Sequence, residues 1–387
     1  MSSLQIRGFK ATSNVAFAER IGNAFEARLP SFLAPLKTVS RKRILEIDIL
    51  RTAAILLLVL YHIPGTSADV PVTVVSNYPL EFVGWTGVCI FFFVSGLSLQ
   101  LSNKTIRNRS DVLHFFKKRM VRIYPMYWVF AVGILILYRP PPVESAIYIV
   151  GWQALFYPIF GATGDIYHFV SVLLIFYLLF PLLAFSNDLK KLLIISLIPF
   201  LFFFAIQFRW GLSDGMFLRY YGLFVAGIVA GKVDVYNKMR QVHSKRFVGF
   251  TILAFGALLS VWVILEDSYF NSYLFDIGLS YLFGVLIVLI TLYWATFYVM
   301  ASRAKFYAFF TFVAFATYGI YFLNSPIFTR VSHTLQFRFD IVGTTTILIL
   351  IALIPFVVVA GYLLQLIVNE IVNFRKAGSK SQARRRA

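Results

Sequence analysis

Long apolar stretches recur along the whole chain, and this feature limits its fold more than any other. A helix that crosses a lipid bilayer needs about 20 mostly apolar residues. We expect such spans at 47–64, 82–101, 121–138, 166–186, 190–208, 216–232, 247–265, 274–299, 306–324 and 342–369. Because a bilayer offers no water to unpaired backbone groups, spans of this kind are helical. The sequence therefore predicts an all-α integral membrane protein.

Composition supports this prediction. Hydrophobic residues make up 59% of the 387-residue chain and charged residues only 14%, with a mean hydropathy of +0.77. Ordinary soluble domains are roughly 45–50% apolar and about 25% charged. The single cysteine, Cys89, excludes an intramolecular disulfide. A large soluble protein is therefore the less favoured interpretation.

The net charge of +19 has two interpretations. In a soluble protein, such an excess of Lys and Arg would favour nucleic-acid binding. Here the basic residues lie between apolar stretches, where the cytoplasmic loops of membrane proteins collect them. The charge therefore predicts contact with the lipid bilayer and its anionic headgroups, and no nucleic-acid partner.

A shorter apolar stretch at 145–160, broken by glycines and a proline, decides the topology. If this stretch spans the membrane, every later basic loop lies outside the cell, against the positive-inside rule. If it does not, Lys190, Lys191 and the basic segments that follow all lie inside. We therefore expect a re-entrant or interfacial segment, about ten transmembrane helices, and both termini in the cytoplasm of a multi-pass protein of the cell membrane.

The charged ends divide the chain into three parts. Residues 1–43 are predicted to form a basic cytoplasmic N-terminal segment, residues 44–372 the membrane domain, and residues 373–387 a basic cytoplasmic tail. The chain contains no obvious repeat of 20–50 residues, which would mark a repeat array. The membrane part is therefore expected to be one domain.

An arginine and a histidine lie on one face of the first expected span. Arg51 and His62 are 11 residues apart, which corresponds to three helical turns plus roughly 20° and a rise of about 16 Å. Asp48 precedes Arg51 by three residues and can pair with it. A lone arginine often only reaches the membrane surface, but ionisable groups in spans usually serve function. Since histidine is also the commonest general base near neutral pH, the pair is a candidate catalytic centre.

Two further segments carry unusual patterns. In Gly87–Gly96 an aromatic run ends in Ser-Gly, which by composition alone indicates close helix packing. The segment 117–128 gathers four cations ahead of a Tyr-Pro-Trp cluster at the start of the third span. It is interpreted either as a positive-inside anchor with an aromatic belt or as a site for a phosphate-bearing cytoplasmic ligand, because Arg matches phosphate oxygens.

Four other polar residues lie in or beside expected spans: His168, Tyr318, Tyr321 and Asn324. Each alone is more often a hydrogen-bonded packing residue than part of a site. The chain contains no Walker loop, no HExxH motif and no paired cysteines. Nothing in the sequence therefore supports nucleotide hydrolysis or a bound metal.

Together the N-terminal segments resemble the membrane-bound acyltransferase 3 family, the O-acetylases of surface polysaccharides. Asp48-Ile-Leu-Arg51 followed by His62 is similar to the family's D-x-x-R and to its His 11 residues after the Arg. Gly87–Gly96 resembles the family's G-V-x-x-F-F-x-x-S-G, and Arg119–Tyr127 resembles R-x-x-R-I-x-P-x-Y. These motifs cover about 80 residues in the right order.

The resemblance extends to a late Y-x-I-Y segment, matched by Tyr318 and Tyr321, and it has three departures. Cys89 stands where the family often has an acidic residue, and Asn324 stands where it often has a His. Residues 167–169 are Tyr-His-Phe, where the family often has a Trp-Phe or an acidic motif. The departures concern the acceptor site and the subfamily and leave the motif of the first span intact.

The resemblance implies acyl transfer from cytoplasmic acyl-CoA, commonly acetyl-CoA, to a hydroxyl of a surface carbohydrate or another envelope acceptor. It implies no tightly bound cofactor, because acyl-CoA is the donor substrate. His62, Arg51 and Asp48 would be catalytic, with His62 as a base or as an acyl relay. The donor would contact Lys118, Arg119, Arg122 and Tyr127, and the acceptor His168, Tyr318, Tyr321 and Asn324.

Two other functions remain open at this point. A multi-pass transporter of a small polar or acylated solute is the main alternative, because a re-entrant stretch and intramembrane Arg and His also suit a carrier. Substrate flux without consumption of an acyl donor would favour the transporter. A non-catalytic scaffold or sensor is the third interpretation, and a silent His62→Ala substitution would favour it.

Overall fold

The structure is a computed structural model, and it describes residues 44–65, 77–103, 106, 108–159, 168–185, 188–211, 216–242, 244–267, 273–301 and 306–386. The predicted basic segment 1–43 lies outside these residues. Within them the chain is all-helical, without a strand. The helices, in chain order, are α3 (Leu45–Gly65), α4 (Asn77–Ser102), α5 (Arg109–Tyr138), α6 (Pro142–Val150), η3 (Gln153–Ile159), α7 (His168–Ala184), α8 (Leu189–Trp210), α9 (Met216–Lys232), α10 (Val235–Gln241), α11 (Lys245–Asp267), α12 (Tyr273–Ala301), α13 (Tyr307–Phe339), α14 (Thr344–Ala352) and α15 (Ile354–Arg386).

Several of these helices are long and apolar. Among the described residues, six helices have the length and composition to cross a membrane: Phe82–Ser102, Arg109–Tyr138, Leu189–Trp210, Tyr281–Ala301, Tyr307–Phe339 and Ile354–Val372. Phe169–Ala184 and Arg246–Val261 are shorter apolar helices. The all-helical membrane class predicted from the sequence agrees with this architecture.

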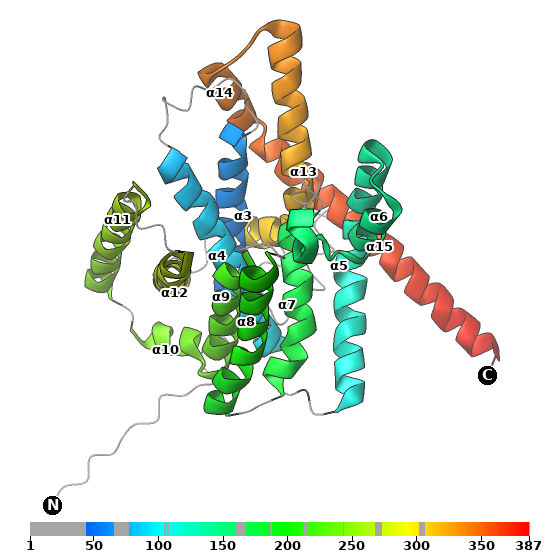
Figure 1. Cartoon of the computed structure of the whole chain (residues 1–387), viewed down its shortest axis with the longest axis horizontal. Helices are drawn as coiled ribbons and strands as arrows, with labels where there is room; N and C mark the ends of the chain where they lie inside the picture. The colour runs from blue at the N-terminus through cyan, green and yellow to red at the C-terminus, as the bar shows by residue number, and fades with distance from the viewer. Residues whose placement is uncertain are drawn as a thin grey trace, which may run out of the picture.

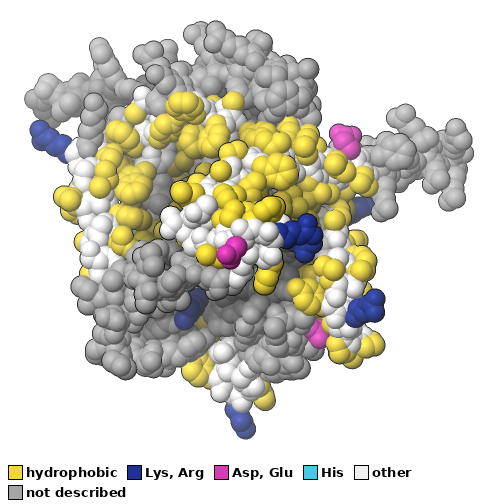
Figure 2. Space-filling view, turned by 90° about the horizontal axis from the view of Figure 1, so that it is seen from above, with side chains coloured by type: hydrophobic (Ala, Val, Ile, Leu, Met, Phe, Trp, Pro, Cys, Tyr) yellow, Lys and Arg dark blue, Asp and Glu magenta, His cyan; other side chains and the backbone are white. Residues whose placement is uncertain are grey.

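Helix α8 has the two faces expected of a helix at the lipid boundary. Its exposed side chains include Ile194, Ile198 and Leu201, whereas Leu192 and Phe203 are buried against the bundle. Figure 2 shows a face of the molecule that carries many hydrophobic and few charged side chains. Apolar surface this extensive is unusual on a soluble monomer and suits contact with lipid.

The centre of the bundle is built on α4, which packs against α9 and α3, while α13 packs against α15 and α3 (Figure 1). Both crossings depend on glycine. A Cβ atom at Gly96 would lie 2.1 Å from the carbonyl oxygen of Phe224 on α9, and one at Gly319 would lie 2.1 Å from that of Gly361 on α15. The missing side chains therefore let these backbones approach closely, as small residues do in membrane bundles.

The segment predicted at 145–160 is described up to residue 159, where it belongs to the short helices α6 and η3. α6 has nine residues, too few to cross a bilayer. The hydroxyl of Tyr124 on α5 donates to the carbonyl of Val150 at 2.7 Å, and the indole of Trp128 donates to that of Ile149 at 3.0 Å. These bonds satisfy carbonyls at the end of α6 that have no partner within the helix. The segment is thereby held against α5.

The third expected span, 121–138, is the second half of a longer helix. α5 already begins at Arg109, because the Asn108 side chain accepts from the backbone of Asp111 at 2.9 Å and the Asp111 carboxylate accepts from that of Asn108 at 3.3 Å. This reciprocal capping box stabilises a polar helix start. The basic residues before the span are therefore helical.

The prediction of one helix over 342–369 is wrong. The chain forms α14 and α15 there, with a turn at Leu353 between them. α15 continues to Arg386, so residues 373–386 of the predicted tail are a helical extension that projects from the bundle (Figure 1).

Candidate active site

A cavity of about 690 Å³ lies between α3, α4, α5, α7, α13 and α15. This volume falls in the usual range of small-molecule sites. The cavity brings together the three N-terminal motifs and the late tyrosine pair, which are far apart in the sequence. Within the described structure, this cavity is therefore the candidate active site.

Cationic side chains line one part of the cavity. Arg51 comes from α3, and Lys118, Arg119 and Arg122 come from the first half of α5. Lys118 and Arg122 are exposed, whereas Arg51 and Arg119 are half-buried. The exposed pair lies where the cavity meets the surface of the molecule, which we call its mouth, and the half-buried pair is more enclosed.

Arg51 is held at the junction of α3 and α4. Its Nη2 donates a hydrogen bond to the Oγ of Ser98 at 2.9 Å. Asp48, which lies one turn earlier on α3 and also lines the cavity, is 3% exposed. The D-x-x-R spacing thus puts a carboxylate and a guanidinium on the same wall.

Arg119 is held by aromatic rings. Its guanidinium carbon lies 5.6 Å from the ring centroid of Phe115 and 5.9 Å from that of Tyr177. These are cation–π distances. The buried Nε of Arg119 makes no hydrogen bond within the described part of the chain. A buried donor without a partner costs about 1–3 kcal/mol, a cost that an anion bound in the cavity would relieve.

The late tyrosines face the same cavity. Tyr318 and Tyr321 are three residues apart on α13, and both line it. The side chain of Tyr318 is hydrogen-bonded to that of Tyr177 on α7. It also lies close enough to Arg51 and Arg122 to interact with their charges. The structure thereby joins the late motif to the cations of the first and third motifs.

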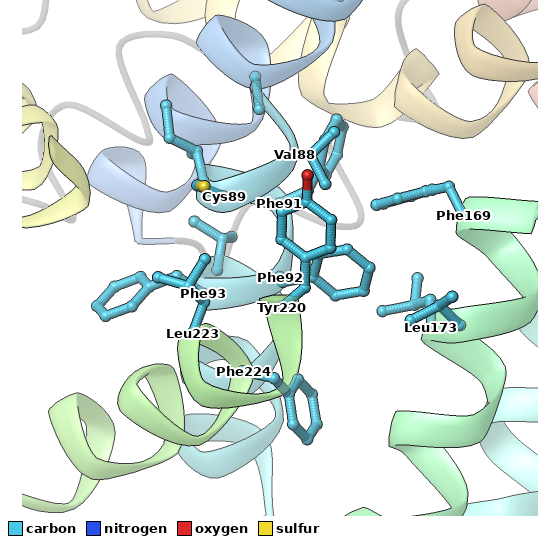
Figure 3. Close-up of a cluster of buried hydrophobic side chains, with 14 of the residues drawn as sticks. Val88, Cys89, Phe91, Phe92, Phe93, Phe169, Leu173, Tyr220, Leu223 and Phe224 are labelled. Atoms are coloured by element: carbon cyan, nitrogen blue, oxygen red, sulfur yellow. The ribbon is translucent and has the colours of Figure 1, made fainter. Parts of the chain in front are cut away.

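The other end of the cavity is aromatic. The ring centroid of Phe169 lies 5.6 Å from that of Phe91 and 5.3 Å from that of Tyr321. Figure 3 shows Phe91 and Phe92 on α4 facing Phe169 and Leu173 on α7. The cavity therefore passes from charged groups to buried rings.

Sequence reasoning missed one wall, which α15 supplies. Gln365, Asn369 and Glu370 line the cavity, and Gln365 Nε2 donates to Asn369 Oδ1 at 3.2 Å. The sequence signal that could have found this wall is the spacing of four residues between Gln365 and Asn369 in an otherwise apolar stretch. This spacing places both amides on one helix face. The contact of Gly319 with Gly361 brings this face close to α13.

The profile of the acyltransferase domain of the acyltransferase 3 family matches residues 44–366. The chain belongs to the acyltransferase 3 family. It is an acyltransferase enzyme, and its apolar helices make it a multi-pass membrane protein. Comparisons with curated proteins and with solved structures found no match. The matched residues of this acyltransferase include the cationic and aromatic parts of the cavity, whereas Asn369 and Glu370 lie beyond the match.

His62, the expected base of the acyltransferase, does not line the cavity. It is half-buried on the same helix as Arg51, about 16 Å further along the axis. Its ring centroid lies 5.5 Å from that of Tyr61. Tyr61 in turn covers Gly84 of α4, because a Cβ at Gly84 would lie 2.4 Å from the tyrosine ring. His62 is therefore positioned where α3 and α4 pack closely.

Tyr127 and Asn324 do not line the cavity of the acyltransferase either. The hydroxyl of Tyr127 donates to the carbonyl of Tyr148 and holds α6 against α5. Asn324 is fully buried, and its amide donates within its own helix at 3.0 Å and 2.7 Å. His168 begins α7, and its side chain lies outside the described part of the structure.

Proposed function

We propose that this membrane acyltransferase moves an acyl group, acetyl in the simplest case, from cytoplasmic acyl-CoA to a hydroxyl of a cell-surface carbohydrate or another envelope acceptor. The observation that carries the proposal is the exposed cationic mouth at Lys118 and Arg122, which leads to an aromatic end. Acyl-CoA has the matching order of groups, with phosphates at one end and an acyl thioester at the other.

We further propose that the chain lies in the cell membrane with this mouth and both termini at the cytoplasm. The support is the distribution of the strongly basic segments, which all fall on that side in this orientation. The shorter apolar helices α7 and α11, together with α3 and α9, bring the six long apolar helices of the described chain to about ten spans.

In this proposal the α5 cations bind the phosphates of the donor. Arginine forks match phosphate oxygens in pairs, and a charge-assisted hydrogen bond is roughly twice as strong as a neutral one. Arg122 is exposed at the mouth, and Arg119 has a buried Nε that a phosphate oxygen would satisfy. We assign Tyr318 and Tyr321 to the donor as well, because they line the same cavity as Arg51.

The transfer step follows from the order of groups along α3. Arg51 polarises the thioester carbonyl, as hydrogen-bond donors do at a developing oxyanion, and Asp48 orients Arg51. His62 lies about 16 Å further along α3 and outside the cavity, so the proton of the acceptor hydroxyl reaches it through intervening water molecules. The hydroxyl oxygen bonds to the acyl carbon, the carbon–sulfur bond breaks, and the CoA thiolate takes up a proton.

The experiment is acyl-CoA binding to the purified full-length protein, measured by titration calorimetry in detergent micelles. We expect Arg119→Gln combined with Arg122→Gln to weaken acetyl-CoA binding by tenfold or more and to reduce its salt dependence. Lys190→Gln with Lys191→Gln is the matched control, because both lysines are exposed at the start of α8 outside the cavity. Unchanged acetyl-CoA affinity in the double arginine variant would contradict the proposed donor site.

A further inference from the structure

The cavity changes from charged to apolar along its length. Lys118 and Arg122 are exposed at one end, whereas Phe91 and Phe169 are 9% and 8% exposed at the other. On α4, the seven residues from Ser98 to Phe91 correspond to a rise of about 10 Å. A ligand that fills this space is therefore anionic at its outer end and apolar at its inner end.

Further aromatic packing closes the apolar end. The ring centroid of Phe169 lies 4.9 Å from that of Phe92, and Phe92 stacks on Tyr220 of α9 at 5.0 Å (Figure 3). Phe92 is fully buried, and Tyr220 is 4% exposed. Close-packed interiors hold few voids larger than a water molecule. The room beyond the first layer of rings is therefore small.

We propose that Phe91, Phe169 and Tyr321 hold the acyl group of the donor and restrict it to short chains. This inference rests on the proposed function, because it takes acyl-CoA as the ligand of the cavity. With the phosphates at the α5 cations and the thioester carbonyl at Arg51, the acyl group extends toward the rings. Phe169 limits the length of the acyl chain, since its ring contacts Phe91 on α4 and Tyr321 on α13 at the same time.

The test compares the binding of acetyl-CoA, butyryl-CoA and octanoyl-CoA to the full-length protein in detergent micelles. The wild type binds acetyl-CoA at least tenfold more tightly than octanoyl-CoA. Phe169→Ala admits more of the chain, and two additional buried methylene groups raise affinity roughly tenfold. The ratio of octanoyl-CoA to acetyl-CoA affinity therefore rises about tenfold in this variant. Phe169→Leu shifts the ratio less, in the same direction, with a smaller loss of packing.

Phe203→Ala is the matched control. Phe203 is 2% exposed on α8 and stacks on Phe217 at 4.7 Å, away from the cavity. Phe203→Ala leaves the ratio of octanoyl-CoA to acetyl-CoA affinity unchanged. If acetyl-CoA binds but both Phe169 variants keep the wild-type ratio, the inference is overturned and the proposed function stands. If the wild type binds none of the three esters, both are overturned.

Discussion

The guanidinium of Arg51 donates a 2.9 Å hydrogen bond to the hydroxyl of Ser98, which joins α3 to α4 at the wall of the cavity. Ser98→Ala removes the acceptor and keeps the charge. We expect kcat/KM for acyl transfer to fall about tenfold, because a hydrogen bond to a charged group contributes about 1.5–3 kcal/mol. Ser102→Ala is the control, since Ser102 is exposed and its hydroxyl donates to the backbone carbonyl of Ser98, which the Ser98→Ala substitution keeps. An equal loss in both variants would mean that α4 is merely sensitive to substitution.

Donor binding and acyl transfer should separate at His62. Because His62 does not line the cavity, His62→Ala should leave the Kd for acetyl-CoA within about twofold of the wild type. Transfer to the envelope should fall at least 100-fold, which is the lower range for loss of a general base. His114→Ala, on the exposed side of α5, should change neither quantity. Wild-type levels of acyl transfer in a well-expressed His62→Ala variant would show that His62 has no role in the transfer step.

The sequence predicts the helices that carry the motifs well, because each is signalled by local hydropathy. The first two spans expected, 47–64 and 82–101, match α3 and α4 within five residues at each end. α5 begins earlier than expected, since hydropathy does not register a polar start that is stabilised by a capping box. The expected span at 342–369 divides because a turn at Leu353 interrupts an otherwise apolar run.

The site was predictable only in part. Arg51, Arg119 and Arg122 stand in local motifs, and the structure brings all three to one cavity. The α15 wall depends on the close crossing of Gly319 and Gly361, a tertiary contact that no local pattern signals.

The same crossing gives a stability prediction. A Cβ at Gly319 would lie 2.1 Å from the Gly361 carbonyl oxygen, which is backbone and has little freedom to move. Gly319→Ala should therefore lower the free energy of unfolding by about 1–3 kcal/mol, as overpacking does, and should lower the Tm. Gly133→Ala on α5, where a Cβ meets nothing within 4 Å, should be neutral or slightly stabilising. Thermal unfolding in detergent measures both, and an undiminished Tm for Gly319→Ala would contradict the close crossing.

A partly buried ion pair links the start of α3 to the short helix α10. Arg240 Nη2 lies 2.6 Å from Glu46 Oε1, and the side chains are 33% and 0% exposed. Arg240→Gln leaves a buried carboxylate without its cation. Losing one partner of a buried pair costs about 3–5 kcal/mol, and because Arg240 is partly exposed we expect about 1–3 kcal/mol.

A double-mutant cycle tests this pair. Glu46→Gln combined with Arg240→Gln should be more stable than Arg240→Gln alone, because no uncompensated charge remains. Thermal unfolding in detergent again provides the measurement. Strictly additive losses would show that the two side chains do not interact energetically.

The most direct test of the whole account follows the acyl group itself. Inverted membrane vesicles with the wild-type protein, with Arg51→Gln, or without the protein receive acetyl-CoA labelled in the acetyl carbonyl. Mass spectrometry then measures label bound covalently to envelope glycans and lipids. The account predicts label with the wild type and at least a 100-fold loss with Arg51→Gln. Wild-type labelling no greater than that of vesicles without the protein would contradict it.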